Sequence, residues 1–400
     1  MLTLSTIVLS AIVFAEPTLH EGIESTLTEM SEAAMAADME GYLGLVWDGE
    51  PELAQEQWAW AVDLERMPPT VLRYEMLDEP KLVGQGEAVV PVRITWNTEN
   101  WEDEDRTIEL PMRFVEEDGR WKFAGRRWSE VDSDGLRVLY TDGLGESAIR
   151  AIDLWPEIKA KVDAGFGRSL DHPQVIKMYT SMPELQFSIF PGYVEPLGGW
   201  NEPMESIKLV GHNFSAGHLR NVIAHEYAHA LTFSMAPHEG SAEAAVARAH
   251  AVPWWVLEGV AELASSNFAP NTGRTEMVVQ RWYEIDRLIE WDDITDFYTV
   301  KSEDYSNVYV QGRHMVSYIN ERFGQDKRNA WLAAMMGGKT IDEATRDVLG
   351  LSFDELDEQW RASIASAFEA RKAAEQSDND ESDRPEKPKT SSNKPSSVGS

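Results

Sequence analysis

The sequence contains no cysteine among its 400 residues. No disulfide can therefore stabilise the fold, and no thiolate can act as a nucleophile or bind a metal. A metal site in this chain has to be built from histidine, aspartate and glutamate side chains. Basic residues are scarce as well, since 36 lysines and arginines stand against 69 aspartates and glutamates. The formal charge of −33 argues against binding to nucleic acid or to an anionic membrane surface.

Apolar segments of transmembrane length are also missing. The uncharged N-terminal segment 1–15 is mostly apolar but too short to span a bilayer. Val13 and Ala15 occupy the −3 and −1 positions of a signal-peptidase site that would cleave before Glu16. We therefore predict a cleavable signal peptide over 1–15 and a secreted or periplasmic protein without stable membrane insertion. The alternative is a buried N-terminal strand or helix.

Hydrophobic periodicity predicts an α+β fold that starts with an accessory domain over 16–131. Apolar residues recur at helical spacing up to about residue 67, with a second helix expected from Pro51 to Met67. The spacing then changes to an alternation over 88–96 and 108–114 that continues at Trp121 and Phe123, which predicts a curved antiparallel sheet. This order of helices and strands resembles the NTF2-like folds.

A polar break at 132–135 is expected to separate this domain from a second domain over 136–370. Strand patterns near its start alternate with a helical pattern, and these predict a small mixed sheet. From Ser215 onward nearly all the periodicity is helical. Residues 371–400 are rich in Ser, Lys, Pro, Asp and Glu and lack apolar periodicity, so we predict a disordered tail.

The segment 225–229, His-Glu-Tyr-Ala-His, is the strongest candidate for chemistry. On an α-helix, residues four apart project from one face, so His225 and His229 can bind the same ion. The surrounding apolar residues predict burial, which is costly for two imidazoles and a carboxylate unless they are paired or bind a metal. We predict one zinc ion per chain, with Glu226 accepting the proton of the attacking water. The alternative is a surface helix with two ordinary histidines.

A catalytic zinc needs a third protein ligand, and a second helical segment offers one. Residues 254–263 read Trp-Trp-Val-Leu-Glu-Gly-Val-Ala-Glu-Leu, so Glu258 and Glu262 lie on one helical face. We predict that Glu258 binds the zinc and that Glu262 accepts the free ring N–H of a zinc-bound histidine. His238 and His250 lie between the two segments and are rival third ligands.

Together these segments resemble the gluzincin zinc metallopeptidases (HExxH…E), and within them a bacterial peptidase MA-like family. The resemblance covers about residues 136–368 and extends to Tyr309-Val-Gln-Gly and to the segment 349–356. It implies a zincin-type domain that hydrolyses bonds in a peptide or protein substrate. It further implies that Tyr309 stabilises the oxyanion, although this tyrosine can equally have a packing role. The strand expected at 206–211 would be an edge strand that pairs with the substrate.

The sequence departs from the gluzincin pattern in two respects, and two rival functions remain open. The spacing between His229 and Glu258 is longer than in the best-known relatives, and the Gly-x-Met-Glu-Asn signature of aminopeptidases is absent, so aminopeptidase activity does not follow. One rival is a non-catalytic protein that keeps zinc in a binding module. The other is a structural envelope protein in which the two helices pack without metal.

Overall fold

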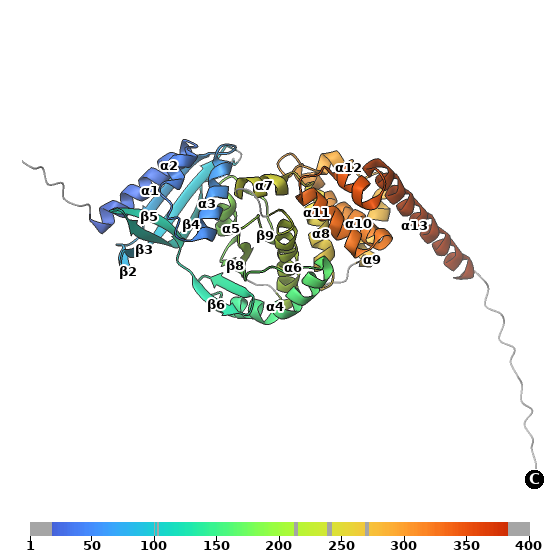
Figure 1. Cartoon of the computed structure of the whole chain (residues 1–400), viewed down its shortest axis with the longest axis horizontal. Coiled ribbons are helices and arrows are strands. Elements are labelled where there is room, and N and C mark those ends of the chain that lie inside the picture. The colour runs from blue at the N-terminus through green and yellow to red at the C-terminus, as the bar shows by residue number, and fades with distance from the viewer. Residues whose placement is uncertain are drawn as a thin grey trace, which may run out of the picture.

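A computed structural model describes residues 18–99, 101, 104–211, 215–237, 242–268 and 272–382. The predicted signal peptide and His238 lie outside these ranges. The described chain is α+β, as predicted, and its parts follow one another along the long axis of the molecule (Figure 1). An N-terminal domain is followed by a second sheet and then by a helical part. Among the described residues, none of the helices combines the length and apolar character needed to cross a membrane.

The N-terminal domain places helices against one face of a curled antiparallel sheet (Figure 1). The helices are α1 (Leu19–Met35), α2 (Met39–Leu43) and α3 (Pro51–Leu64). The strands are β1 (Pro69–Met76), β2 (Lys81–Gly84), β3 (Glu87–Thr98), β4 (Arg106–Glu117) and β5 (Arg120–Arg126), in the order β1-β3-β4-β5 with β2 also on β3. Every second residue of β3 is buried, and this alternation is what holds the strand's apolar face on the helices.

The second sheet is mixed and has the order β6-β7-β8-β10-β9. Its strands are β6 (Ser129–Ser133), β7 (Leu136–Tyr140), β8 (Gln174–Tyr179), β9 (Gly199–Trp200) and β10 (Ile207–Val210). β7, β8 and β10 run parallel, whereas β6 and β9 are antiparallel to their neighbours.

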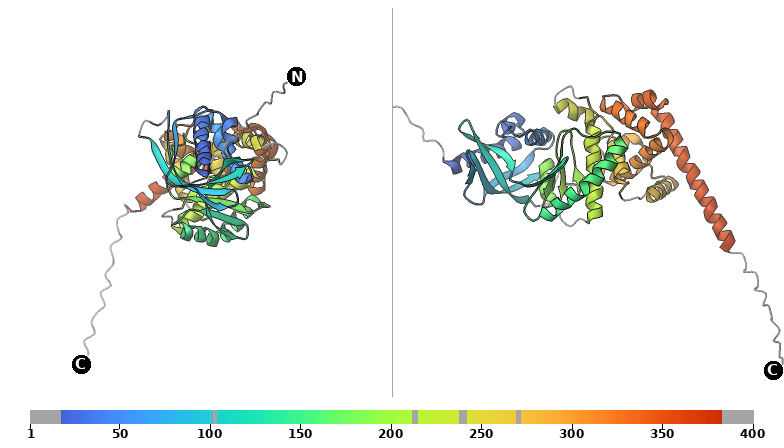
Figure 2. Two further views of the ribbon diagram at one scale, coloured as in Figure 1. Left: turned by 90° about the vertical axis from the view of Figure 1, so that its left-hand side faces the viewer. Right: turned by 60° about the horizontal axis from the view of Figure 1, so that its bottom comes forward.

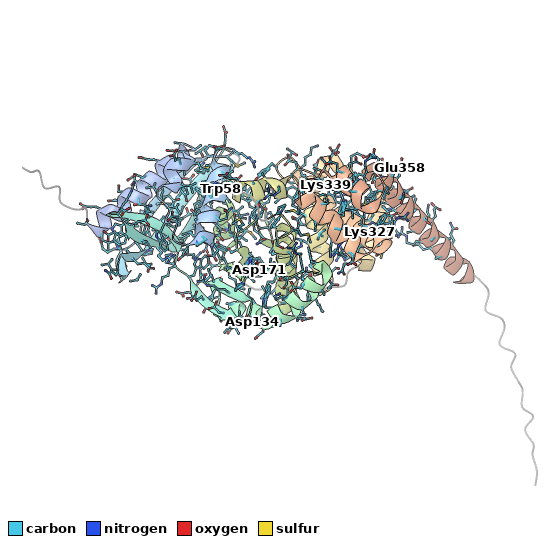
Figure 3. All side chains as sticks on the ribbon, in the orientation of Figure 1. Trp58, Asp134, Asp171, Lys327, Lys339 and Glu358 are labelled. Atoms are coloured by element: carbon cyan, nitrogen blue, oxygen red, sulfur yellow. The ribbon has the colours of Figure 1, made fainter. Side chains whose placement is uncertain are left out.

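One expectation about this sheet is wrong, and another stays a prediction. The polar segment 132–135, where the domain boundary is expected, lies at the turn of the β6–β7 hairpin, and Asp134 lies at an outer edge of the molecule (Figure 3). The chain leaves the first sheet after Arg126 and enters the second at Ser129. The strand expected at 206–211 is not an edge strand, because β10 is flanked by β8 and β9. The edge position belongs to the two-residue strand β9.

The second part of the chain is mostly helical, as predicted, but its helices reach beyond residue 370. Its longer helices are α4 (Gly145–Phe166), α6 (Ala216–Phe233), α8 (Trp254–Ser265), α9 (Thr272–Glu284), α10 (Tyr305–Phe323), α11 (Gln325–Met336) and α13 (Phe353–Ser382). The shorter ones are α5 (Met182–Ile189), α7 (Ala242–His250), α12 (Ile341–Ala344) and 3₁₀ turns at Trp291–Ile294 and Ser302–Asp304. α13 extends away from the body (Figure 2). Because this helix ends at Ser382, the first twelve residues of the predicted disordered tail, 371–382, are helical. Residues 383–400 lie outside the described part of the chain.

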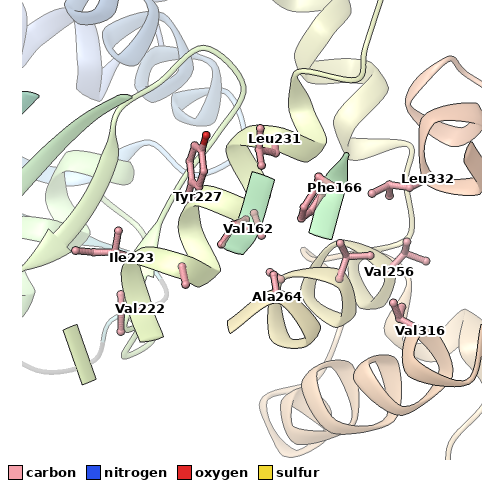
Figure 4. Packing of buried hydrophobic residues seen from close by; sticks show 14 of the residues in the cluster. Val162, Phe166, Val222, Ile223, Tyr227, Leu231, Val256, Ala264, Val316 and Leu332 are labelled. Carbon is pink, nitrogen blue, oxygen red and sulfur yellow. The ribbon is translucent and has the colours of Figure 1, made fainter. Parts of the chain in front are cut away.

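The core of the helical part lies between helices α4, α6, α8, α10 and α11 (Figure 4). Helices α8 and α10 cross without intervening side chains. A Cβ atom at Gly259 would lie 2.6 Å from the carbonyl carbon of Gly312, and one at Gly312 would lie 2.5 Å from the carbonyl oxygen of Trp255. Glycine at both positions therefore lets the two backbones touch. This contact fixes α8, and with it Glu258, in the centre of the domain.

A buried ion pair joins the N-terminal domain to the second sheet. Nζ of Lys177 on β8 lies 2.5 Å from Oε2 of Glu56 on α3, and both side chains are more than 90% buried. The other carboxylate oxygen of Glu56 accepts the backbone N–H of Ser206 at 3.3 Å. Removing one partner of a buried pair leaves an uncompensated charge, which typically costs about 3–5 kcal/mol. The two domains are therefore held together by specific polar contacts as well as by apolar packing.

Candidate metal centre and catalytic site

Helix α6 brings the two motif histidines onto one face. Its N-terminus is capped by Ser215, whose side chain accepts the backbone N–H of His218 at 3.2 Å. The apolar residues Leu219, Ile223 and Leu231 are at most 1% exposed and hold the helix in the core. His225 and His229 therefore lie one turn apart, and both are largely shielded from solvent.

Helix α8 packs against α6 and supplies the carboxylate between these imidazoles. Nε2 of His225 lies 3.0 Å from Oε2 of Glu258, and Nε2 of His229 lies 3.6 Å from the same oxygen. The two Nε2 atoms are 3.2 Å apart. Zinc–donor distances of about 2.0–2.2 Å at tetrahedral angles would separate donor atoms by roughly 3.3–3.6 Å. These three residues could therefore hold a metal ion with little rearrangement, and they are the one such cluster among the described residues.

The surroundings of the cluster orient its side chains. Oε1 of Glu262 lies 3.3 Å from Nδ1 of His225, the ring nitrogen that faces away from the cluster. The indole N–H of Trp254 donates to Oε1 of Glu258 at 2.9 Å, which leaves Oε2 for the imidazoles. Sequence reasoning missed this role of Trp254, although its place four residues before Glu258 would have allowed the contact. Nδ1 of His229 is buried and has no hydrogen-bond partner among the described residues.

The ionisable groups of the cluster shift one another's pKa values. Burial raises the pKa of Glu258, but the neighbouring His229 and His225 outweigh burial and hold that pKa well below its usual range. Burial lowers the pKa of His225, but its hydrogen bonds with Glu258 and Glu262 outweigh burial, so this pKa lies well above its ordinary value. The carboxylates of Glu258 and Glu262 therefore favour a positive charge on or next to His225.

Glu226 lies beside the cluster but outside it. Its side chain is 5% exposed, and burial raises the pKa of its carboxyl against the opposing effect of His225 and His229. Strand β9 passes directly over it, because a Cβ atom at Gly199 would lie 2.7 Å from both Cγ and Oε1 of Glu226. Only glycine leaves room for this carboxylate. The pattern of the sequence carries no signal for this contact between residues 27 positions apart.

A cavity of about 620 Å³ opens onto the cluster and Glu226. Many of the side chains that line it are aromatic, namely Tyr193, Trp200, Phe233, Trp254, Phe297, Tyr298, Tyr305 and Tyr309. The N-terminal domain contributes Arg66, whose guanidinium lies 3.9 Å from the ring centre of Tyr298. A volume of this size fits several residues of an extended peptide or a comparable small molecule.

The remaining candidates take different places around this cavity. The ring of Tyr309 lies 6.4 Å from that of His225, and burial raises the pKa of its hydroxyl well above its ordinary value, so the hydroxyl stays a hydrogen-bond donor. His250 also lines the cavity, but its Nε2 lies 3.4 Å from Oε2 of Glu202 and not in the cluster. His238, the other rival ligand, lies outside the described residues.

A family model described as the Peptidase MA superfamily matches residues 157–366, slightly more than half of the 400 residues. The matched region contains both site helices, strand β9 and Tyr309, whereas the N-terminal domain lies before it. No curated protein matches the chain.

Proposed function

The chain belongs to the Peptidase MA superfamily, and we propose that it is a zinc-dependent peptidase of the gluzincin type. In this proposal His225, His229 and Glu258 bind one zinc ion, and Glu226 is the general base. One observation carries this proposal. The donor atoms of His225, His229 and Glu258 lie 3.0–3.6 Å from one another, and the buried carboxylate of Glu226 lines the same open cavity. Cleavage of a broad peptide library by the purified protein, with and without a chelator, tests it.

The mechanism assigns a task to each side chain. A zinc ion held there would polarise the scissile carbonyl and lower the pKa of a bound water to about 7. Glu226 would accept a proton from the attacking water and later pass it to the leaving amine. Glu262 and Trp254 would hold His225 and Glu258 in place, as outer hydrogen-bond partners do in zinc sites.

Strand β9 offers a place for the substrate backbone. One side of β9 pairs with β10 through Trp200 and Gly199, and β9 is the edge of the sheet. Both residues also line the cavity. We propose that an extended peptide adds to this edge and so brings its carbonyl next to Glu226. This replaces the predicted role of the segment 206–211, which is interior to the sheet.

We propose that Tyr309 donates a hydrogen bond to the oxyanion, since its ring faces His225 across the cavity. Tyr309→Phe should reduce kcat by about 10²–10³-fold, because one oxyanion donor is lost. KM should change less, because the donor acts mainly in the transition state. Steady-state kinetics with a peptide that the wild-type protein cleaves, together with zinc analysis, measures this. If Tyr309→Phe keeps the wild-type kcat, Tyr309 has only a packing role, and the roles of the other residues in the mechanism are unaffected.

Two further proposals concern the fold and the location of the protein. The helices followed by a curled antiparallel sheet support an NTF2-like assignment for the N-terminal domain, and the matched region supports a zincin-type assignment for the second. A solved structure superposed on both fold types would test these assignments. Export rests on the N-terminal segment alone, and a mature N-terminus at Glu16 in the intact mass of the natural protein would test it.

A further inference from the structure

Residues 190–198, which we call the strap, connect α5 to strand β9 and are bound by side chains of the N-terminal domain. The indole N–H of Trp96 donates to the carbonyl oxygen of Pro191 at 3.1 Å. Nη1 of Arg106 donates to the carbonyl oxygen of Tyr193 at 2.9 Å. Trp96 on β3 and Arg106 on β4 are directly paired in the sheet. Two neighbouring side chains of this sheet therefore each donate a hydrogen bond to the strap.

Gln186 on α5 completes this attachment. Its side-chain oxygen accepts a hydrogen bond from Nη2 of Arg106, and its Nε2 donates to the carbonyl oxygens of Val194 at 2.9 Å and Glu195 at 2.8 Å. Gln186 is 3% exposed, so these bonds are shielded from competing water. The two terminal nitrogens of one planar guanidinium therefore link α5 to the strap, a geometry that an ammonium group cannot reproduce.

The far end of the strap reaches the catalytic carboxylate. The ring of Tyr193 packs edge-on against Trp200 of β9 at a centroid distance of 5.4 Å. The strap then enters β9 at Gly199, whose backbone lies against Glu226. Near its other end the strap passes Met67 of the N-terminal domain, since a Cβ atom at Gly192 would lie 2.0 Å from Sδ of Met67. Continuous contacts thus run from the N-terminal sheet through the strap and β9 to Glu226.

We propose that Arg106 is a positioning residue of the peptidase site, which fixes β9 over Glu226 by binding the strap. This inference rests on the proposed function. It assigns a role in catalysis to a domain outside the matched region, since Arg106 and Trp96 precede residue 157. The N-terminal domain is then a structural part of the active site and not an appended module.

The test is Arg106→Met in the full chain, which removes both donors and keeps an unbranched side chain. Catalytic groups displaced by about 1 Å can lose about 100-fold in rate, so we expect kcat/KM to fall by about 10- to 100-fold. Zinc content should stay at the wild-type level, because the hydrogen bonds and ion pairs of the three donors among the described residues join them to one another, to Trp254 and to Glu262, and not to the strap. Backbone amides of residues 190–201 should exchange hydrogen faster. Arg73→Met is the matched control, because Arg73 lies on β1 of the same sheet, exposed and paired with Asp105. It should leave kcat/KM and exchange in 190–201 unchanged.

The exchange measurement separates this inference from the proposed function. If the wild-type protein cleaves no peptide, the proposed function fails, while exchange still decides whether Arg106 holds the strap. Trp96→Phe keeps a buried aromatic ring and removes only the donor to Pro191, so it serves if Arg106→Met does not fold. Wild-type exchange in 190–201 or wild-type kcat/KM in the folded variant would overturn the proposal.

Discussion

Replacing Glu226 by glutamine should lower peptide hydrolysis by at least about 10²–10⁴-fold, as expected for the loss of a general base. The amide keeps the shape of the side chain, so it still fits below Gly199, but it cannot accept the proton of the attacking water. Zinc should stay bound, because Glu226 is not one of the three clustered donors. The measurement is kcat/KM for a peptide that the wild-type protein cleaves in a chelator-sensitive way.

Glu157→Gln is a matched control for this variant. Glu157 is a half-exposed carboxylate on α4 that pairs with Lys161 on the same helix and with Arg220 on α6, and it does not line the cavity. This variant should retain wild-type turnover. Wild-type turnover in Glu226→Gln with zinc bound would show that another group takes the proton and would contradict the mechanism.

Glu258→Ala should release zinc almost completely, whereas Glu262→Ala should weaken zinc binding by only about 10–100-fold. Glu258 supplies the oxygen that both imidazoles face, and its removal leaves two donors. Glu262 contacts His225 only through the outer ring nitrogen. Competition with a chelator of known zinc affinity measures both variants. If Glu258→Ala keeps full affinity while His238→Ala or His250→Ala loses zinc, the ligand assignment is wrong.

Those parts of the fold that rest on local periodicity could be predicted. The alternation over 88–96 and the helical pattern around His225 each match one strand or helix of the structure. Strands β1 and β2 were missed, because β1 begins with proline at a sheet edge and β2 is fully exposed, so neither carries a full alternation. The polar segment 132–135 lies at a hairpin turn, and a hairpin turn and a linker share the same polar composition, so composition alone does not distinguish them.

In the candidate site, too, the features that depend on local spacing could be predicted, whereas the contacts between distant segments could not. The spacing of 225–229 and of 254–263 is local, and it predicts His225 and His229 on one helix face and Glu258 and Glu262 on another. The approach of Gly199 to Glu226, and the attachment of the strap to Trp96 and Arg106, join segments that are far apart in the sequence. Such contacts leave no periodic pattern, so only the structure shows them.

A zinc titration of the metal-free protein tests the central claim most directly. The protein is stripped of metal and zinc is returned in known amounts while cleavage of a peptide substrate is followed. The account predicts that activity is absent without metal, rises in proportion to added zinc and stops rising at one zinc per chain. The His225→Ala and His229→Ala variants should show no such rise. Full activity in the metal-free protein, or tight binding of one zinc with no cleavage of any peptide in a broad library, would contradict the account.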